Sequence, residues 1–280
     1  MPDLTTSGGL RLHYRDSAGA EGGDGPPVLC LSGLTRNSAD FAFVLPFLAG
    51  YRVIRMDYRG RGLSEAADPA TYTVAQEAQD ALELLDHLGL ERVTILGTSR
   101  GGLIAMALAM AAPERLQGAI LNDIGPELSP GGLGRIMDYV GRRPKYRSYD
   151  EAAEGLAALN AVQFPGVTLA RWRVHAEHVW RAVPGERLAL RYDAGLREAL
   201  AQAGVQPAPD LWPFFDALAA LPLTVLHGAN SDLLSADIVA RMQARAPGMR
   251  AVTVPDRGHV PFLDEGAALE GILSHLKDHI

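Results

Sequence analysis

The sequence has 280 residues, of which 48% are hydrophobic and 21% are charged, and its formal net charge is −7. A chain of this size and composition buries a large core, which excludes a disordered protein and fits one domain or a domain with an insertion. Lys and Arg form no run along the chain, so nucleic acid is not an expected partner. The single cysteine, Cys30, excludes an intrachain disulfide and a multi-cysteine metal site.

The first residues contain no basic segment followed by an apolar one, which is the pattern of a secretory signal. No uninterrupted apolar stretch reaches the roughly 18 residues that a membrane-spanning helix needs. We therefore predict a cytoplasmic protein without a membrane span, and the sequence leaves its oligomeric state open.

Short apolar runs that end at turn residues alternate with longer segments of helical periodicity. An early segment around His13 and Tyr14 is predicted to form antiparallel edge strands. Six later runs are apolar on both faces, as in a sheet covered on both sides, and are predicted as strands at 27–31, 51–56, 93–96, 119–121, 223–226 and 251–254. Helices are predicted at 74–88, 102–111, 236–246 and 267–277. This order predicts an α/β fold with a mostly parallel central sheet flanked by helices.

Residues 126–220 interrupt the alternation. They contain no predicted strand, and helices are predicted there at 132–141, 149–160, 168–183 and 188–203. The segment is far longer than the dozen or so residues that a crossover between parallel strands requires. We therefore predict a helical cap, residues 126–220, inserted into a core formed by residues 1–125 and 221–280.

A G-x-S-x-G motif, Gly97 to Gly101, joins the predicted strand 93–96 directly to a predicted helix. This setting is typical of a nucleophile elbow, a tight turn that lifts a serine hydroxyl above the sheet and needs glycines because larger side chains would collide across it. Ser99 is therefore predicted as the nucleophile. The backbone N–H of Arg100 opens the helix and is a predicted oxyanion donor. The Arg100 side chain is expected to pair with an acid beside the turn.

A serine hydroxyl needs a base, and a third group must orient that base. Of the eight histidines, His259 is the predicted base, because it lies in a loop directly after the last predicted strand. Asp123 and Asp232 each follow a strand between Ser99 and His259, so both fit the order Ser, Asp, His. We prefer Asp232 because it comes later and closer to His259. Whether Asp123 assists or replaces it stays open.

The loop Ser32-Gly33-Leu34 follows the predicted strand 27–31, and the N–H of Leu34 is the predicted second oxyanion donor. With this loop the chain resembles the α/β-hydrolase superfamily, in the branch that carries a helical cap. The resemblance rests on motifs in matching order along the core: 32–34, 57–64, 97–102, 123–126, 228–232 and 258–259. It implies a serine nucleophile, an acyl-enzyme, and hydrolysis of a small molecule without a cofactor.

Serine at position 99 excludes the dehalogenase and epoxide hydrolase chemistry of this fold, which needs a carboxylate nucleophile. We predict cleavage of an ester or lactone in a small, largely apolar substrate. Two alternatives are a carbon–carbon bond hydrolase of vinylogous diketones and a ligand-sensing receptor on the same fold.

Arg36, next to the oxyanion loop, is a candidate ligand for a substrate carboxylate. Aromatic residues of the cap are further candidates for lining a pocket, although most are expected to hold the cap together: Tyr139, Phe164, Trp172, Trp180 and Trp212. His175 and His178 are too few to predict a metal site.

Overall fold

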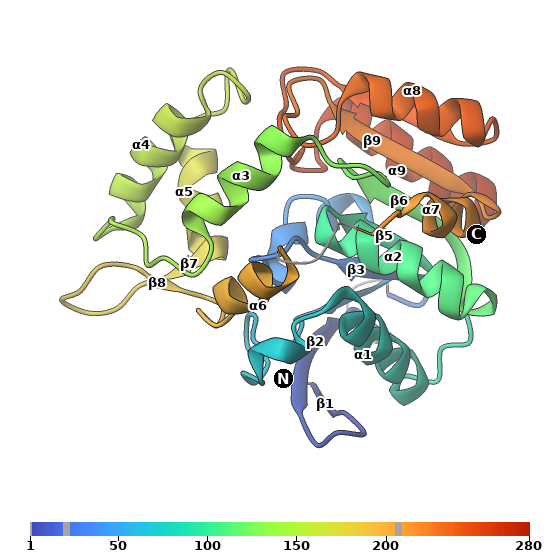
Figure 1. Cartoon of the computed structure of the whole chain (residues 1–280), viewed down its shortest axis with the longest axis horizontal. Coiled ribbons are helices and arrows are strands. Elements are labelled where there is room, and N and C mark those ends of the chain that lie inside the picture. Colours follow the sequence, from blue (N-terminus) through green and yellow to red (C-terminus); the bar gives the residue numbers. More distant parts are fainter. Residues whose placement is uncertain (1, 19–22, 205–208) are drawn as a thin grey trace.

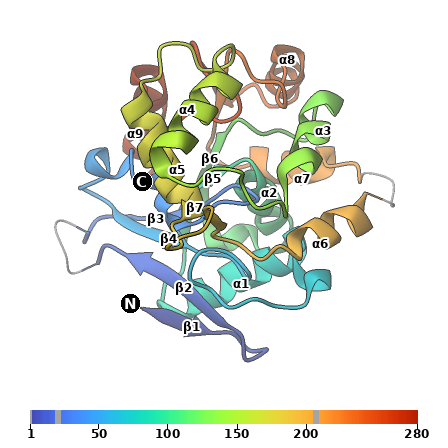
Figure 2. The ribbon, with the colours of Figure 1, turned by 90° about the vertical axis from the view of Figure 1, so that its left-hand side faces the viewer.

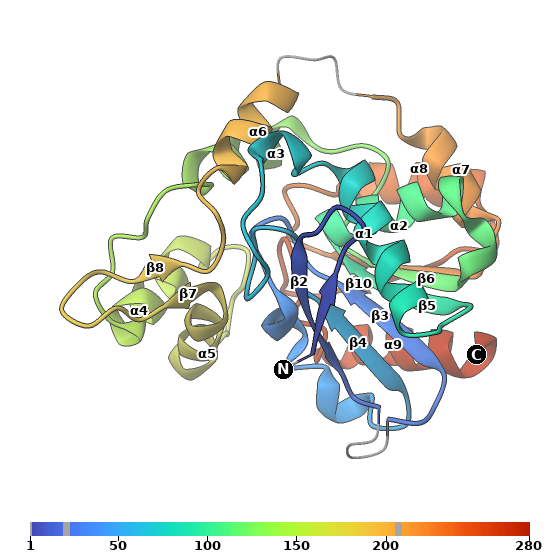
Figure 3. The same cartoon turned by 90° about the horizontal axis from the view of Figure 1, so that it is seen from below.

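The computed structural model describes residues 2–18, 23–204 and 209–280, which form an eight-stranded sheet with helices around it (Figure 1). The strand order is β1-β2-β4-β3-β5-β6-β9-β10. The strands are β1 (Asp3–Thr5), β2 (Arg11–Asp16), β3 (Pro27–Leu31), β4 (Arg52–Met56), β5 (Val93–Thr98), β6 (Leu116–Asn122), β9 (Leu223–Gly228) and β10 (Arg250–Val254). β1 and β2 form an antiparallel hairpin at one edge (Figure 3), β2 pairs antiparallel with β4, and all other pairs are parallel. This confirms the predicted mostly parallel α/β sheet.

Helices cover both faces of the sheet, which explains why its central strands are apolar throughout. Leu29 and Leu31 of β3 pack in a core cluster with α1 (Val74–His87), α2 (Arg100–Ala111), α7 (Trp212–Ala219) and α8 (Ala236–Arg245). Val28 and Cys30, which point to the opposite face, pack with α9 (Gly266–His279). Short 3₁₀ turns lie at Ser38–Phe41, Leu45–Phe47, Pro69–Thr71 and Pro113–Arg115.

An inserted segment between β6 and α7 lies to one side of the sheet (Figures 1 and 2). It contains α3 (Pro130–Tyr139), α4 (Tyr149–Asn160), α5 (Leu169–Val179), β7 (Trp180–Arg181), β8 (Ala189–Leu190) and α6 (Leu196–Ala203). The β7–β8 hairpin was not predicted. Because of it, the helix predicted at 168–183 ends at Val179, and the helix predicted at 188–203 begins only at Leu196. Two-residue strands carry too little periodicity to be recognised in the sequence.

One helix of the predicted cap packs with the core instead. Phe215 and Leu218 of α7 are fully buried in the cluster that includes Ile104 of α2. By its contacts α7 therefore belongs to the core, although the predicted cap ran to residue 220. Residues 205–208 of that cap lie outside the described residues. In the described part of the chain, no helix has both the length and the apolar character needed to cross a membrane.

Candidate active site

The predicted elbow is present as a sharp turn between β5 and α2. Ser99, the residue between them, has φ 50° and ψ −114°, a backbone conformation that non-glycine residues rarely adopt. A Cβ added at Gly97 would lie 2.8 Å from the backbone of Gly101, and one at Gly101 would lie 2.0 Å from the carbonyl oxygen of Leu31. Both glycines are therefore required by close packing of backbone against backbone.

The elbow brings Ser99 into contact with His259, as the sequence predicted. His259 Nε2 lies 2.9 Å from Ser99 Oγ, and His259 Nδ1 lies 2.7 Å from Oδ2 of Asp123. A carboxylate only accepts hydrogen bonds, so Nδ1 carries the proton and Nε2 is free to accept the hydroxyl proton of Ser99. The three side chains form one continuous chain of hydrogen bonds, in the tautomer that a general base needs.

Asp123 follows β6, the strand next to β5, and its side chain is fully buried. Its Oδ1 accepts a hydrogen bond of 2.8 Å from the backbone N–H of Gly228, and its Oδ2 accepts one of 2.5 Å from the hydroxyl of Ser231. The donors come from the last residue of β9 and from the loop after it. Together with His259 they satisfy the buried carboxylate and fix its orientation.

The prediction that Asp232 orients His259 is wrong in this structure. Asp232 instead pairs with Arg135 of α3 at 3.0 Å, and its side chain is 28% exposed. The end of β9 and the loop that carries Asp232 contribute Gly228 and Ser231 to the site, and both residues donate to Asp123. A usable signal was strand adjacency: Asp123 comes directly after β6, the strand that follows the elbow in the chain, and successive strands of such sheets are commonly neighbours.

The loop after β3 lies against the elbow. A Cβ added at Gly33 would lie 3.9 Å from Ser99 Cβ and 3.3 Å from Arg36 Cγ, so both side chains flank this glycine. A turn closes here through a 3.1 Å hydrogen bond from the Arg36 N–H to the Gly33 carbonyl. The Leu34 carbonyl accepts from Arg61 Nε at 3.1 Å. This arrangement is compatible with the predicted oxyanion role of the Leu34 N–H, which stays a prediction.

A buried carboxylate, Glu77, pairs with two arginines next to the elbow. Arg100 Nε lies 2.5 Å from Glu77 Oε2, and Arg61 Nη2 lies 2.9 Å from Glu77 Oε1. The Arg100 guanidinium also donates to the carbonyl of Tyr72 at 2.9 Å. This confirms the expected pairing of Arg100 with an acid beside the turn, and Glu77 links that turn to Arg61, which donates to the Leu34 carbonyl in the loop after β3.

The inserted segment reaches the site through α5 and the connection before it. Arg36 Nη1 lies 2.8 Å from Nε2 of His175 on α5. His175 is buried, and burial, together with nearby positive charge, holds its pKa well below the ordinary value. A Cβ added at Gly258 would lie 2.6 Å from Gln163 and 3.0 Å from Phe164, so the inserted segment presses on the loop that carries His259.

The aromatic residues predicted as candidates for lining a pocket mostly pack against other side chains, and one of them is exposed to solvent. Phe164 and Trp172 are buried against Phe262 of the His259 loop, with ring centroids 5.7 and 5.6 Å from it. They join the inserted segment to the core. Tyr139, at the end of α3, is 48% exposed.

Two tryptophans predicted to line the pocket have other contacts. Trp180 packs against Tyr146 within the inserted segment. Trp212 Nε1 donates to Glu127 Oε1 at 2.6 Å, and its ring stacks edge-on against Phe215 in the core. These contacts are structural, so neither residue gains support as a substrate ligand.

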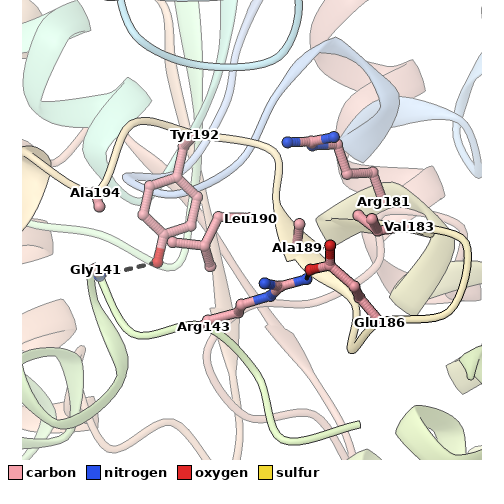
Figure 4. A pocket seen from close by; sticks show the side chains of 9 residues that line it. All are labelled: Gly141, Arg143, Arg181, Val183, Glu186, Ala189, Leu190, Tyr192 and Ala194. Atoms are coloured by element: carbon pink, nitrogen blue, oxygen red, sulfur yellow. Dashed lines mark hydrogen bonds and ion pairs between the residues drawn. The ribbon is translucent and has the colours of Figure 1, made fainter. Parts of the chain in front are cut away.

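A shallow pocket of about 450 Å³ opens between the β7–β8 hairpin and the end of α3 (Figure 4). Tyr192 points across it to the backbone N–H of Gly141, and Arg143 lies beside Glu186. The lining contains none of Ser99, His259 and Asp123, so this pocket is separate from the proposed site.

An eight-stranded sheet with a serine elbow, a histidine after the last strand and a buried aspartate defines an α/β hydrolase. The family model for the alpha/beta hydrolase fold matches residues 26–266, and the protein belongs to this family and is a hydrolase.

Known proteins are similar to most of the chain. It is 38% identical over 247 residues to the 3-hydroxybutyrate-oligomer hydrolase of Cupriavidus necator, covering 85% of this chain and 84% of the relative. It is 26% identical over 240 residues to the 2-(acetamidomethylene)succinate hydrolase of Mesorhizobium japonicum, covering 85% and 83%. An alpha/beta hydrolase from Novosphingobium aromaticivorans superposes with a TM-score of 0.91 and 43% identity, covering 99% of this chain and 97% of that one.

Proposed function

We propose that this hydrolase cleaves a carboxylic ester through an acyl-enzyme on Ser99, with His259 as general base and Asp123 as its orienting partner. The observation that carries the proposal is the hydrogen-bonded chain from Ser99 Oγ through the imidazole to the buried carboxylate. An isolated serine is a weak nucleophile, and this chain is the arrangement that activates it.

In the proposed first step, Ser99 Oγ attacks the ester carbonyl while its proton moves to His259 Nε2. The imidazolium that forms is stabilised by the charge of Asp123, to which its Nδ1–H is already bonded. The N–H groups of Leu34 and Arg100 are proposed to stabilise the oxyanion. His259 then gives its proton to the departing alcohol, and the acyl group stays on Ser99.

In the second step, His259 takes a proton from water, which attacks the acyl carbonyl. Collapse of this intermediate releases the carboxylic acid and returns the proton to Ser99. Each proton is accepted and donated at the same nitrogen, so the site needs no further acid.

One relative supports the proposed substrate class. A hydrolase of 3-hydroxybutyrate oligomers, matched over most of both chains, supports an ester between short hydroxy acids as the substrate. A lactone of such an acid presents the same carbonyl chemistry to Ser99 and is the second substrate type to test.

The test is hydrolysis of p-nitrophenyl butyrate, the 3-hydroxybutyrate dimer and a short lactone by the purified protein and by Ser99→Ala. We expect Ser99→Ala to lose at least about 10⁴-fold in kcat, as removal of a triad member does in serine hydrolases. Ser274→Ala, on α9, is the control and should keep normal activity.

Undiminished ester turnover by Ser99→Ala would refute the proposal. Cleavage of a dienoate without ester hydrolysis would favour the carbon–carbon hydrolase alternative. Ligand-dependent melting shifts without turnover would favour the receptor alternative.

A further inference from the structure

We propose that Arg36 and His175 form a carboxylate-binding subsite beside Ser99, so that the hydrolase selects esters carrying a free carboxylate a few bonds from the scissile carbonyl. The inference rests on the proposed ester hydrolysis and adds a substrate class to that site.

The first support is position. The Arg36 side chain and Ser99 flank the same glycine, Gly33, on the loop proposed to hold the oxyanion. The Arg36 side chain is 25% exposed, so solvent reaches it. The Ser99 and Arg36 side chains are therefore close enough for one small substrate to contact both.

The second support is the partner of Arg36. An arginine has no acceptor, so the 2.8 Å contact from its Nη1 requires an unprotonated Nε2 on His175. His175 is therefore neutral, in agreement with the effect of its burial. A neutral acceptor orients the guanidinium without adding a negative charge, so the anion paired with Arg36 is Asp40, 3.5 Å from the same Nη1.

The third support is the contrast with another arginine near the site. Arg171 donates to both oxygens of Asp264, at 3.0 and 2.6 Å, which uses its charge and its fork of donors in the fold. The nearest carboxylate oxygen to Arg36, on Asp40, is 3.5 Å away, beyond a normal charge-assisted hydrogen bond. Among the described residues, the Arg36 guanidinium hydrogen-bonds to His175, which leaves its Nε and Nη2 donors for a ligand.

The fourth support is rigidity. His175 is packed edge-on against Trp172 and Phe262, with ring centroids 5.6 and 5.7 Å away. Packing around Tyr139 raises the pKa of its phenol, and the nearby charge of Arg36 opposes that increase. Tyr139 therefore lies near Arg36, and Thr35 hydrogen-bonds to its phenol.

For an oligomer of a short hydroxy acid, this subsite has a direct consequence. Such an oligomer carries one free carboxylate, at the end where the last acid is not esterified. Holding that end at Arg36 places a terminal ester at Ser99, so the acid at the carboxyl end is the alcohol released on acylation.

The experiment compares two ligands that differ in charge but hardly in shape, 3-acetoxybutyrate and 3-acetoxybutanamide. Their binding to Ser99→Ala and to the double variant Ser99→Ala/Arg36→Gln is measured by calorimetry, which needs no turnover. We expect the acid to bind Ser99→Ala 10- to 100-fold more tightly than the amide, because a hydrogen bond to a charged group contributes about 1.5–3 kcal/mol. The double variant should bind the two with nearly equal affinity.

Arg173→Gln, added to Ser99→Ala, is the matched control. Arg173 lies on α5 two residues from His175 but is exposed and paired with Asp150 and Glu177. This control should keep the full preference for the acid. Equal affinities in Ser99→Ala, undetectable binding of both ligands, or a preference that survives Arg36→Gln would overturn the proposed subsite.

Turnover of the same ligands separates this inference from the proposed function. Acetate release that depends on Ser99 but shows no preference for the acid removes the subsite and leaves the ester hydrolase standing. Preferential binding of the acid without Ser99-dependent release removes the hydrolase mechanism and leaves the subsite standing.

Discussion

Replacement of Asp123 by Asn tests the proposed triad at the residue that sequence order did not select. The substitution keeps the shape of the side chain and removes its charge. In the protein, Oδ1 accepts from the Gly228 N–H, while Oδ2 accepts from both Ser231 and His259. An asparagine oriented to accept from Gly228 must place its NH₂ group at the position of Oδ2.

That NH₂ group would donate toward His259 Nδ1 and so favour the tautomer with the proton on Nε2. An Nε2–H cannot accept the proton of Ser99, so the base is lost although the geometry is kept. The same substitution in a serine protease triad lowers kcat about 10⁴-fold. We expect a loss of that size here, which corresponds to about 5.5 kcal/mol of barrier.

The assay is initial-rate hydrolysis of p-nitrophenyl butyrate, with melting temperature as the check on folding. Asp232→Asn is the matched control, because it removes only the ion pair with Arg135. We expect its rate to stay within about twofold, since partly exposed ion pairs contribute little. An Asp232→Asn variant that loses activity, beside an active Asp123→Asn variant, would refute the assignment.

Two further predictions concern stability. Burial lowers the pKa of His275 from 6.5 to about 4, so between these pH values the unfolded chain binds a proton that the folded protein does not. The free energy of unfolding should therefore fall as pH drops from 6.5 to 4, and His275 should contribute up to about 3 kcal/mol of that fall. Urea unfolding should show a smaller fall for His275→Gln than for the unmodified protein. An identical fall in the two proteins would contradict the role of His275. Gly101→Ala should cost about 3 kcal/mol or more, because its Cβ would meet the Leu31 carbonyl oxygen at 2.0 Å. Gly248→Ala, which meets nothing within 4 Å, is the control, and calorimetry showing equal melting temperatures for the two variants would be incompatible with this packing.

The core of the fold and two members of the site were predictable because they follow local patterns. Strands buried on both faces are apolar throughout, and the strand, elbow and helix around Ser99 are contiguous in the chain. His259 could be selected because it lies in the loop after the last strand. These signals need no knowledge of how distant segments pack.

The aspartate could not be selected in this way, because two residues satisfied the same chain order. The choice depends on which strand end lies beside the elbow and on which carboxylate finds buried donors. Asp123 accepts hydrogen bonds from the Gly228 N–H and the Ser231 hydroxyl, which lie about a hundred positions later in the chain. The end of β9 and the loop of Asp232 thus complete the site through backbone and hydroxyl groups, which a search for acids overlooks.

The sequence pattern also could not predict where the inserted segment ends. The apolar composition of α7 does not distinguish a cap helix from a core helix. Only its packing beside α2 assigns it to the core. The β7–β8 hairpin is held by two residue pairs, Trp180 with Leu190 and Arg181 with Ala189, and leaves no periodic trace.

The contact of Gln163 and Phe164 with Gly258 couples the inserted helices to the residue beside the general base. Any outward swing of those helices to admit a ligand would also release pressure on the imidazole-bearing loop. Opening of the entrance and alignment of the proton acceptor are then coupled, and a foreign set of helices grafted between β6 and α7 must reproduce this contact, together with the packing of Phe164 and Trp172 on Phe262, to leave the enzyme competent.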